Sequence, residues 1–574
     1  MTSDAALADL ETTALDRAVD ELAATADQWR QLSLVAKRDL LREVGRRIST
    51  QAAEWVAAGC AGRGVSPEAP IAGEEWVSGP WVTLAYCNAL ADTVDAVARG
   101  DDPVRGVRLR SHAQGGQIVV DVLPHDPFDR VLMSGFRIEV WMQPGVTVER
   151  VRATAGVGLP EGAGGGVALV LGAGNITSIA PLDVLYKLYA TNQVVILKPS
   201  PVVAAMTPVL RRVFAPFVGR GFMQIVDGGP DVGRYLADHP KVGSVHLTGS
   251  AATHDAIVFG PGEEGARRKA QGRPRLTKPV TSELGGVNPT IVLPGRWKDA
   301  DLRFQAEHVA SQKLINCGFT CIASQVLVLP RDWPQADRFL EQLEQVLASA
   351  TSCPAYYPGA DRRHEHAVAA RPSARRYSGL RALVPDLNPA DPTDPLLNSE
   401  VFGPVLGVVR LPGHDARMFL GEAVSFANDV VPGTLGANLI GDPASLKGLG
   451  PELDRMISRL RFGCVGVNSW TGVAYLTPRA PWGAFPGACL DDVQSGVGIV
   501  HNALLLEASE RSVVFGPFRP APRSVLAGEL SLSPKPPWFV TNRTARTTGQ
   551  LLTRFAADPG WRHVPAIVAS AIRG

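Results

Sequence analysis

The sequence lacks the charge imbalance and the cysteine density that mark several specialised protein classes. Among its 574 residues, 57 Lys and Arg oppose 56 Asp and Glu, which leaves a formal net charge of +1. This balance gives no global electrostatic reason to expect nucleic acid or an anionic membrane as a partner. The seven cysteines form an odd, scattered set, so we expect reduced thiols rather than a disulfide framework.

The sequence also lacks a long uninterrupted apolar run. Its most apolar stretch, residues 167–188, is interrupted by Gly172, Gly174, Asn175, Pro181, Asp183 and Lys187. A lipid-facing helix would not tolerate these residues cheaply, so we expect no membrane span. The chain starts with acidic residues where a secretory signal carries basic ones, in MTSDAALADLETTALD, which is typical of a helix. We therefore expect no export and a cytoplasmic location.

The length and the hydrophobic periodicity indicate a multidomain α/β protein. A chain of 574 residues is too long for one hydrophobic core, so two or three domains are expected. Near the start, apolar residues at three- and four-residue spacing predict amphipathic helices. From residue 167 onward, short apolar runs at 167–171, 194–197, 224–226 and 245–247 alternate with helical stretches. This alternation predicts βαβ units around a mostly parallel sheet.

Three further segments have a distinct pattern. Residues 136–143 alternate apolar and polar side chains, which predicts an edge or interface strand. Residues 260–278 are polar and rich in Gly and Arg, and we expect an exposed loop that contributes no core. The segment from Arg519 onward has eight Arg or Lys against two acids, and it contains Pro520, Pro522, Pro534, Pro536 and Pro537. This composition indicates an appended arm that wraps the body.

Three local motifs contain residues that could perform chemistry. The glycine turn at 172–177 follows an apolar strand, as a cofactor-cradling turn does, but it lacks the third glycine of the dinucleotide fingerprint. Glu283 lies in an almost uncharged, glycine-flanked segment that would raise its pKa and suit a general base. By itself, the glycine turn could equally be an ordinary tight turn. A lone glutamate such as Glu283 is more often a helix-capping or turn acid than a general base.

The third motif places Cys321 just after a glycine turn, where backbone N–H groups would stabilise a thiolate and an oxyanion. Cys317 lies four residues earlier and His308 lies upstream. These three side chains have irregular spacing and lack a fourth ligand, so we expect no metal site. For either cysteine alone, a small buried side chain is the alternative interpretation.

Taken in order, these motifs resemble the aldehyde dehydrogenase superfamily over roughly residues 10–505. As in that family, an Asn precedes by 23 positions the Lys that closes the next strand, here Asn175 and Lys198. Similar family segments are Leu-Thr-Gly-Ser at 247–250, Glu-Leu-Gly-Gly at 283–286 and Gly-Phe-Thr-Cys at 318–321. The Glu-Val-Phe-Gly-Pro segment at 400–404 completes the set.

The resemblance implies an α/β fold with a doubly wound cofactor domain, a second α/β catalytic domain and a small oligomerisation strand extension. It places the cofactor-binding domain at residues 1–130 and 146–285 and the catalytic domain at 286–485. The oligomerisation strands would be 131–145 and 490–505, with strand 136–143 pairing near 496–501. Residues 506–574 form a carboxyl-terminal extension of unknown role. A homodimer or homotetramer is expected.

The resemblance also implies an NAD(P)-dependent oxidation of an aldehyde to a carboxylic acid through a cysteine thiohemiacetal and thioester. The catalytic residues would be Cys321 as nucleophile, Glu283 as general base and Asn175 as oxyanion donor. The cofactor, NAD or NADP, would be bound by Lys198, Gly249, Ser250, Leu284, Glu400 and Phe402. The expected partner is a small-molecule aldehyde, with neither nucleic acid nor a metal ion.

The sequence departs from the family pattern at two site positions. Phe319 replaces the usual Gln or Glu of the nucleophile box, and it could narrow or dry the approach to the thiol. Pro201 stands where NAD-preferring members often carry a Glu, which leaves the preference between NAD and NADP open. Two alternatives remain: a CoA-acylating aldehyde dehydrogenase, and an inactive homologue that only binds cofactor or has a structural role.

Overall fold

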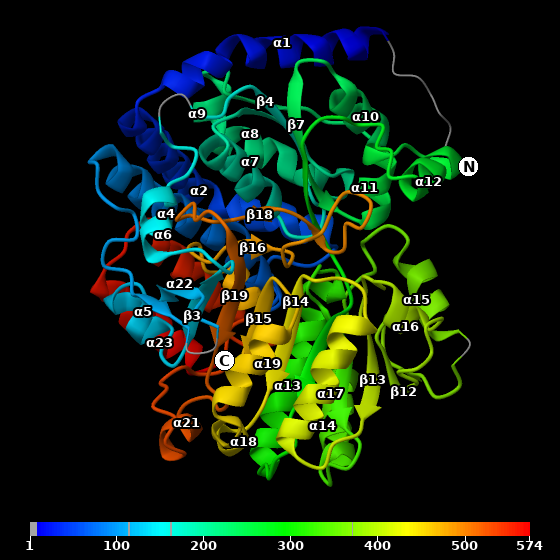
Figure 1. The fold of residues 1–574 in the computed structure, drawn as a ribbon. Helices are drawn as coiled ribbons and strands as arrows, with labels where there is room; N and C mark the ends of the chain where they lie inside the picture. Colours follow the sequence, from blue (N-terminus) through cyan, green and yellow to red (C-terminus); the bar gives the residue numbers. More distant parts are fainter. Residues whose placement is uncertain (1–8, 113–114, 161–162, 370) are drawn as a thin grey trace.

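A computed structural model describes residues 9–112, 115–160, 163–369 and 371–574 (Figure 1). The first eight residues of the predicted amino-terminal helix lie outside the described residues. From Asp9 the segment is helical, as α1 (Asp9–Gln31), and Leu15, Val19 and Leu22 on its predicted apolar face are buried. Among the described helices, none combines the length and the apolar character needed to cross a bilayer.

Among the described residues, the first of two large sheets has six strands. In spatial order they are β17 (Gly496–Val497), β8 (Val280–Leu284), β7 (Val242–Gly249), β4 (Val167–Leu171), β5 (Val194–Lys198) and β6 (Met223–Ile225). The chain starts in β4, winds outward through β5 and β6, and then returns to add β7 and β8 on the other side. All five of these strands are parallel, so the predicted doubly wound sheet is confirmed.

Continuous apolar runs form this sheet because it is covered on both faces. Every residue of β4 and β5 is buried, as expected for strands of a parallel sheet between helices. Helices around it are α2 (Leu34–Gly62), α4 (Val82–Ala98), α7 (Ile179–Ala190), α8 (Thr207–Val213), α10 (Pro230–Asp238) and α11 (Ala251–Val258). Figure 1 shows this unit in the upper half of the molecule.

The second sheet has eleven strands in the part of the chain that the structure describes. It lies in the lower half of the molecule (Figure 1). In spatial order they are β1 (Leu109–Ser111), β2 (Ile118–Leu123), β3 (Arg137–Met142), β19 (Ser509–Phe515), β15 (Cys464–Val467), β14 (Gly436–Ile440), β9 (Asn288–Val292), β10 (Ser324–Pro330), β13 (Val405–Leu411), β12 (Ala382–Leu387) and β11 (Arg375–Arg376). The strands from β19 to β12 are parallel, which makes this a second α/β unit. Its longer helices are α13 (Asp299–Leu314), α14 (Ala336–Ser349), α17 (Ala416–Asp429), α18 (Pro443–Leu449) and α19 (Pro451–Arg459).

The remaining described elements are mostly short. They are α3 (Ala72–Trp76), η1 (Val77–Trp81), α5 (Pro127–Leu132), α6 (Val148–Thr154), η2 (Pro201–Met206), α9 (Ala215–Val218), α12 (Gly262–Ala270), η3 (Ile315–Gly318), α15 (Ala360–Val368), α16 (Pro395–Asn398), α20 (Gly472–Tyr475), α21 (Arg523–Leu526), α22 (Ala545–Ala557), η4 (Trp561–His563), α23 (Val564–Ala571) and the paired strands β16 (Trp482–Gly483) and β18 (Ile499–Val500).

The predicted pairing of strand 136–143 with residues 496–501 is wrong. The strand forms as β3, but it pairs with β2 on one edge and with β19 on the other. Residues 496–497 pair with β8 instead, and residues 499–500 pair with β16. The physical reason is that β19 extends the second sheet beside β15 and offers β3 an edge within the same chain.

The segment 260–278 is also more ordered than predicted, because it contains α12. Arg267 and Arg268 pair with Glu264 one turn earlier, and Lys269 reaches Asp255 of α11 at 2.8 Å. The segment is largely exposed, as expected, but Leu276 is buried in the core of the first unit. Local ion pairs therefore stabilise a helix that the glycine and arginine content obscured.

The carboxyl-terminal arm wraps the body, as its composition predicts. Helix α22 packs on α3 so closely that a Cβ at Gly73 would lie 2.3 Å from the backbone of Ala545. On the same contact, a Cβ at Gly549 would lie 2.6 Å from the Cβ of Trp76. The two glycines thus permit a helix contact that places the arm beside the amino-terminal helices (red and blue in Figure 1).

Candidate active site

A left-handed turn at the end of α13 positions Cys321. Three consecutive residues, Asn316, Cys317 and Gly318, have φ values of 51°, 58° and 82°. A Cβ at Gly318 would lie 2.7 Å from the backbone nitrogen of Pro404, so only glycine fits there. The turn leaves Cys321 partly exposed while the residues on either side of it are buried.

Buried polar contacts fix this turn. The Asn316 backbone N–H donates to Glu74 Oε2 at 2.9 Å, and Arg63 Nη1 donates to Asn316 Oδ1 at 3.1 Å. The Asn316 amide in turn donates to the carbonyl oxygens of Asn175 and Phe319, both at 2.9 Å. The loop that carries Cys321 is therefore clamped by residues from the amino-terminal helices and from the turn after β4.

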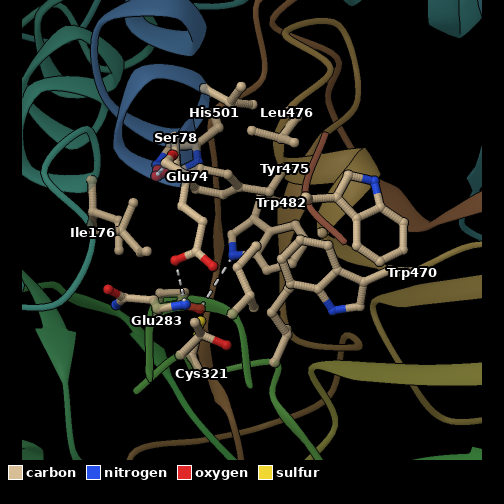
Figure 2. Close-up of a pocket in the computed structure, with 18 of the residues that line it drawn as sticks. Glu74, Ser78, Ile176, Glu283, Cys321, Trp470, Tyr475, Leu476, Trp482 and His501 are labelled. Atoms are coloured by element: carbon tan, nitrogen blue, oxygen red, sulfur yellow. Dashed lines mark hydrogen bonds between the residues drawn. The ribbon is translucent and has the colours of Figure 1, made fainter. Parts of the chain in front are cut away.

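Glu283 lies next to the thiol, on β8. Its side chain is only 4% exposed, and it accepts hydrogen bonds from the Cys321 thiol and from Trp482 Nε1, the latter at 3.1 Å (Figure 2). Burial raises the pKa of Glu283 to about 7, despite these two hydrogen bonds. Burial, and then the nearby Glu283 carboxylate, raise the pKa of Cys321 well above its ordinary value. The resting thiol is therefore neutral and has a carboxylate in place to take its proton.

Asn175 lies in the turn after β4 and contacts the same loop. Its Nδ2 donates to the Phe319 carbonyl oxygen at 3.1 Å, and the side chain is buried. An amide nitrogen carries two N–H groups, so a second donor remains. Asn175 lines the same cavity as Cys321. The three predicted catalytic residues, Asn175, Glu283 and Cys321, are thus brought together from three different elements.

Two cavities meet at these residues. The first, which we call the aromatic pocket, is lined by Trp470, Tyr475, Trp482 and Trp538 together with Val77, Ile176, Ile179, Ile315, Ile322, Leu476, Val500 and His501. Figure 2 shows Cys321 and Glu283 at its lower end, with the rings of Trp470, Tyr475 and Trp482 opposite Ile176. The pocket is therefore an apolar, ring-lined approach to the thiol.

The second cavity, which we call the strand-end cleft, encloses about 530 Å³ at the carboxyl ends of β4, β5 and β7. Of the predicted cofactor residues, the ones that line it are Lys198, Gly249, Ser250, Glu400 and Phe402. Both cavities are also lined by Thr248, Glu283 and Cys321. A group bound in the cleft and a group bound in the pocket would therefore meet at the thiol.

The cleft offers cationic and hydrogen-bonding groups. Burial lowers the pKa of Lys198, and Arg234 and Arg363 also line the cleft. Ser250 caps α11, whose free N–H groups give the cleft a positive end. At the other end, burial and then the charge of Glu283 raise the pKa of Glu400 to about 8.

Phe402 has a left-handed backbone, with a φ of 45°, and its ring lies 4.8 Å from that of Tyr357. Behind it, Lys313 of α13 donates to the Gly403 carbonyl oxygen at 2.9 Å. This contact ties the segment that carries Glu400 and Phe402 to the helix that precedes the nucleophile turn.

Two site expectations need qualification. Leu284 packs in the core of the first unit, and its N–H donates to the Ser495 carbonyl oxygen at 2.8 Å, so a cofactor contact would have to use its carbonyl oxygen. The expectation that Phe319 narrows the approach to the thiol is wrong. Its ring is buried against Tyr356, Tyr357 and Phe402 rather than lining the aromatic pocket, because these rings form a separate cluster behind the turn.

The expectation that all cysteines are reduced is also wrong for two of them. Cys317 and Cys353, 36 residues apart in sequence, are joined by a disulfide with a Cα–Cα distance of 5.4 Å. The turn points Cys317 away from the site toward the loop that follows α14. His308 Nδ1 lies at hydrogen-bond distance, 3.0 Å, from Gln305 Oε1. The described part of the chain contains no cluster of His, Cys, Asp or Glu that could hold a metal ion.

Sequence reasoning missed the residues that clamp the turn and those that line the aromatic pocket. Arg63 and Glu74 lie more than 240 residues before Asn316, and nothing in their local pattern points to it. Trp482, His501 and Trp538 come from the last hundred residues of the chain. Trp470 and Trp482 lie in the predicted catalytic domain, His501 in a predicted oligomerisation strand and Trp538 in the extension, so no shared motif linked them.

The chain is similar in sequence to known aldehyde dehydrogenases. The model of the aldehyde dehydrogenase family matches residues 165–359. Aldehyde dehydrogenase LUC3 of Fusarium is 28% identical over 57% of this chain and 67% of that protein. The mouse dimeric NADP-preferring aldehyde dehydrogenase is 25% identical over 46% of this chain and 55% of that protein. These matches thus span between about half and two thirds of the length of the curated relatives.

Solved structures resemble the chain over a larger part of its length. The Mycobacterium tuberculosis aldehyde dehydrogenase complexed with NAD⁺ has a TM-score of 0.59 and 19% sequence identity. The superposition covers 88% of this chain and 89% of that chain. At this identity the likeness concerns the fold alone.

Proposed function

Because this chain belongs to the aldehyde dehydrogenase superfamily, we propose that it oxidises an aldehyde to a carboxylic acid with NAD or NADP as the hydride acceptor. The observation that carries the proposal is the position of Cys321 and Glu283, which line both the aromatic pocket and the strand-end cleft. An aldehyde in the pocket and a dinucleotide in the cleft would meet at a thiol that has its own base.

The residues of the cleft fit a dinucleotide. The cleft lies at the carboxyl ends of parallel strands, where open α/β sheets bind nucleotides. The amino end of α11, with Gly249 and Ser250, would face the pyrophosphate, and Lys198 would bind the adenosine ribose. Glu400 and Phe402 would hold the nicotinamide end, which supplies the hydride acceptor when bound.

Four steps involve this chain's own groups. Glu283 takes the proton of the Cys321 thiol, and the thiolate sulfur forms a bond to the aldehyde carbon. The second N–H of the Asn175 amide and the Cys321 backbone N–H hold the resulting oxyanion. Loss of hydride leaves a thioester on Cys321. Glu283 releases its first proton to solvent and then deprotonates the water that cleaves the thioester. The departing Cys321 thiolate takes this second proton back from Glu283, which releases the carboxylic acid and restores the thiol.

The preference between NAD and NADP follows from the groups near Lys198. Pro201 begins η2 and lines the cleft, so this position presents no carboxylate to repel a 2′-phosphate. Lys198 and Arg234 line the same cleft. We therefore propose that NADP is accepted as well as NAD. Calorimetric Kd values for the two cofactors test this, and a Kd for NADP a hundredfold above that for NAD would contradict it.

A homodimer or homotetramer and a cytoplasmic location stay proposals. A similar mouse protein is described as dimeric. In this chain, however, β3 is paired on both edges within the molecule. An oligomer would therefore form through a surface other than the edge of β3.

A panel of aldehydes, assayed with each cofactor and with and without CoA, tests the proposed reaction. We expect formation of NAD(P)H and free acid without CoA, and no NAD(P)H from the Cys321→Ala variant although that variant still binds cofactor. A strict requirement for CoA would identify a CoA-acylating enzyme, against which the retained Glu283 counts. Cofactor binding without any oxidation would identify an inactive homologue.

A further inference from the structure

Three residues that line the aromatic pocket have buried polar atoms without a hydrogen-bond partner among the described residues. They are Thr320 Oγ1, Trp470 Nε1 and His501 Nδ1. Each side chain is at most 5% exposed. Buried polar atoms are almost always hydrogen-bonded in native proteins, because an unsatisfied one loses its hydration without compensation. Their concentration in one pocket beside the nucleophile therefore points to hydrogen-bonding groups on the bound substrate.

The chemistry of His501 specifies the kind of group. Its Nε2 lies 3.3 Å from Asp183 Oδ1, and Asp183 also accepts from Thr248 Oγ1 at 2.9 Å. Although burial opposes ionisation, the charge of His246 and the hydrogen bonds from His246 and His501 hold the pKa of Asp183 well below its ordinary range. Burial lowers the pKa of His501 and keeps its ring neutral.

In a neutral imidazole, one ring nitrogen carries the proton and the other is an acceptor. The carboxylate of Asp183 can only accept, so the proton of His501 resides on Nε2. Nδ1 is then a hydrogen-bond acceptor. The pocket thus contains a buried acceptor that calls for a donor on the substrate.

The walls of the pocket specify the shape of the substrate. In Figure 2, the rings of Trp470, Tyr475 and Trp482 lie on one side and Ile176 on the other. His501 and Cys321 are at opposite ends of this view, and the His501 ring packs edge-on against Tyr475 at 4.9 Å. A flat aromatic ring fits such walls better than a flexible chain, since aromatic contacts favour stacked and edge-on arrangements.

The carboxyl-terminal arm completes these walls. Trp538, which lies in the extension of unassigned role, lines the pocket, and its ring centre is 5.3 Å from that of Trp470. The neighbouring Phe539 ring stacks on Phe304 of α13 at 5.1 Å and so anchors the arm to the helix before the nucleophile turn. The extension thereby gains a role as one wall of the substrate site.

We propose that the substrate is an aromatic aldehyde whose ring carries a hydroxyl group, with the ring among the indoles and the hydroxyl donating to His501 Nδ1. This inference rests on the proposed aldehyde oxidation and names its substrate class. The donor, rather than added bulk, is what the site recognises.

Matched aldehydes test the inference. We would measure kcat/KM for 3- and 4-hydroxybenzaldehyde, the corresponding methoxybenzaldehydes, benzaldehyde and hexanal. The hydroxy and methoxy groups both donate electrons to the ring, but only the hydroxy group can donate a hydrogen bond. We expect at least one hydroxy compound to exceed its methoxy partner about tenfold, the order expected when a buried acceptor is left unpaired. Equal values for every pair, or hexanal as the best substrate, would overturn the inference.

Variants locate the effect. His501→Phe keeps a ring but removes the acceptor, and should bring the ratio of hydroxy to methoxy kcat/KM close to one. The matched control is His254→Phe. His254 is also buried, pairs with a carboxylate through Nδ1 and has an unpartnered Nε2, but it lies outside the aromatic pocket. The control should keep the wild-type ratio, and a ratio that falls equally in both variants would contradict the assignment to His501.

A binding measurement separates this inference from the proposed reaction. In Cys321→Ala, calorimetric Kd values for the same hydroxy and methoxy pairs do not depend on turnover. If the wild type oxidises no aldehyde, the proposed function fails, and tighter binding of the hydroxy compounds would still support the donor site. If aldehydes are oxidised but the two Kd values are equal, the donor site fails and the reaction stands.

Discussion

The most informative prediction concerns the ionisation of Glu283. Burial raises its pKa from an ordinary 4.5 to about 7, which corresponds to about 3 kcal/mol of cost for charging it in the site. If this carboxylate is the base, kcat/KM should rise about tenfold per pH unit between pH 5 and 7 and level off above, because only the ionised form accepts a proton.

The measurement is a pH profile of kcat/KM under conditions that keep the enzyme folded, with stability checked at each pH. An unperturbed carboxyl group would be fully ionised at pH 6, so the profile would be flat from pH 6 to 8. A flat profile would refute the argument that burial of Glu283 controls the reaction.

Glu283→Gln provides the second half of the same test. The amide keeps the shape and can still accept from Trp482, but it cannot take a proton. Turnover should fall about 10² to 10⁴-fold, the usual contribution of a general base. Because the Cys321 thiol is neutral and donates to Glu283, the rapid burst of NAD(P)H should also slow, and higher pH should partly restore it. An unchanged steady-state rate would leave Glu283 as a structural acid.

Three further predictions follow from the same geometry. Cys321→Ala should abolish oxidation in steady-state assays, whereas Cys317→Ala should keep most activity because Cys317 points away from the site. The reverse result would show that the nucleophile has been misassigned. Trp538→Ala should lower kcat/KM for benzaldehyde about tenfold more than for propanal, and equal losses would mean that this wall does not contact the ring. Light scattering at micromolar concentration should give a dimer or tetramer that survives charge substitutions on β3; a monomer would contradict oligomerisation.

The parts of the fold that sequence predicts are those with a local cause. Strands β4 and β5 appear as continuous apolar runs because both faces of a parallel sheet are covered. Lys198, Gly249 and Glu400 were found at the cleft because each belongs to a short motif at the end of a strand or in its loop. In contrast, the partner of β3 depends on which distant edge is free. The alternation of apolar and polar residues in β3 specifies which side chains face the core, but neither the register of pairing nor the neighbouring strand.

No local sequence pattern identifies Arg63 and Glu74 as the residues that hold the nucleophile turn. Their contacts with Asn316 lead to a final prediction. Glu74 accepts from the Asn316 backbone N–H and pairs with Arg63 at 3.5 Å, all within a buried setting. Glu74→Ala would leave a buried donor unsatisfied, at a cost of about 1 to 3 kcal/mol, while Glu75 at 3.3 Å still faces the guanidinium. Both Tm and kcat should fall, because the turn carries Cys321.

Glu74→Gln is the matched control for this prediction. Burial raises the pKa of Glu74 to about 7, so at pH 6 the wild-type group is mostly protonated and resembles the amide. The variant should then match the wild type in Tm and kcat at pH 6. At pH 8 the two proteins differ, because residue 74 is charged in the wild type and neutral in the variant. If Glu74→Ala kept full kcat at a temperature where it is folded, the contact with Asn316 would stabilise the protein without positioning the thiol. If Glu74→Gln lost as much activity at pH 6 as Glu74→Ala, the Glu74 carboxyl group would have to be ionised at that pH, and its charge rather than the hydrogen bond would hold the turn.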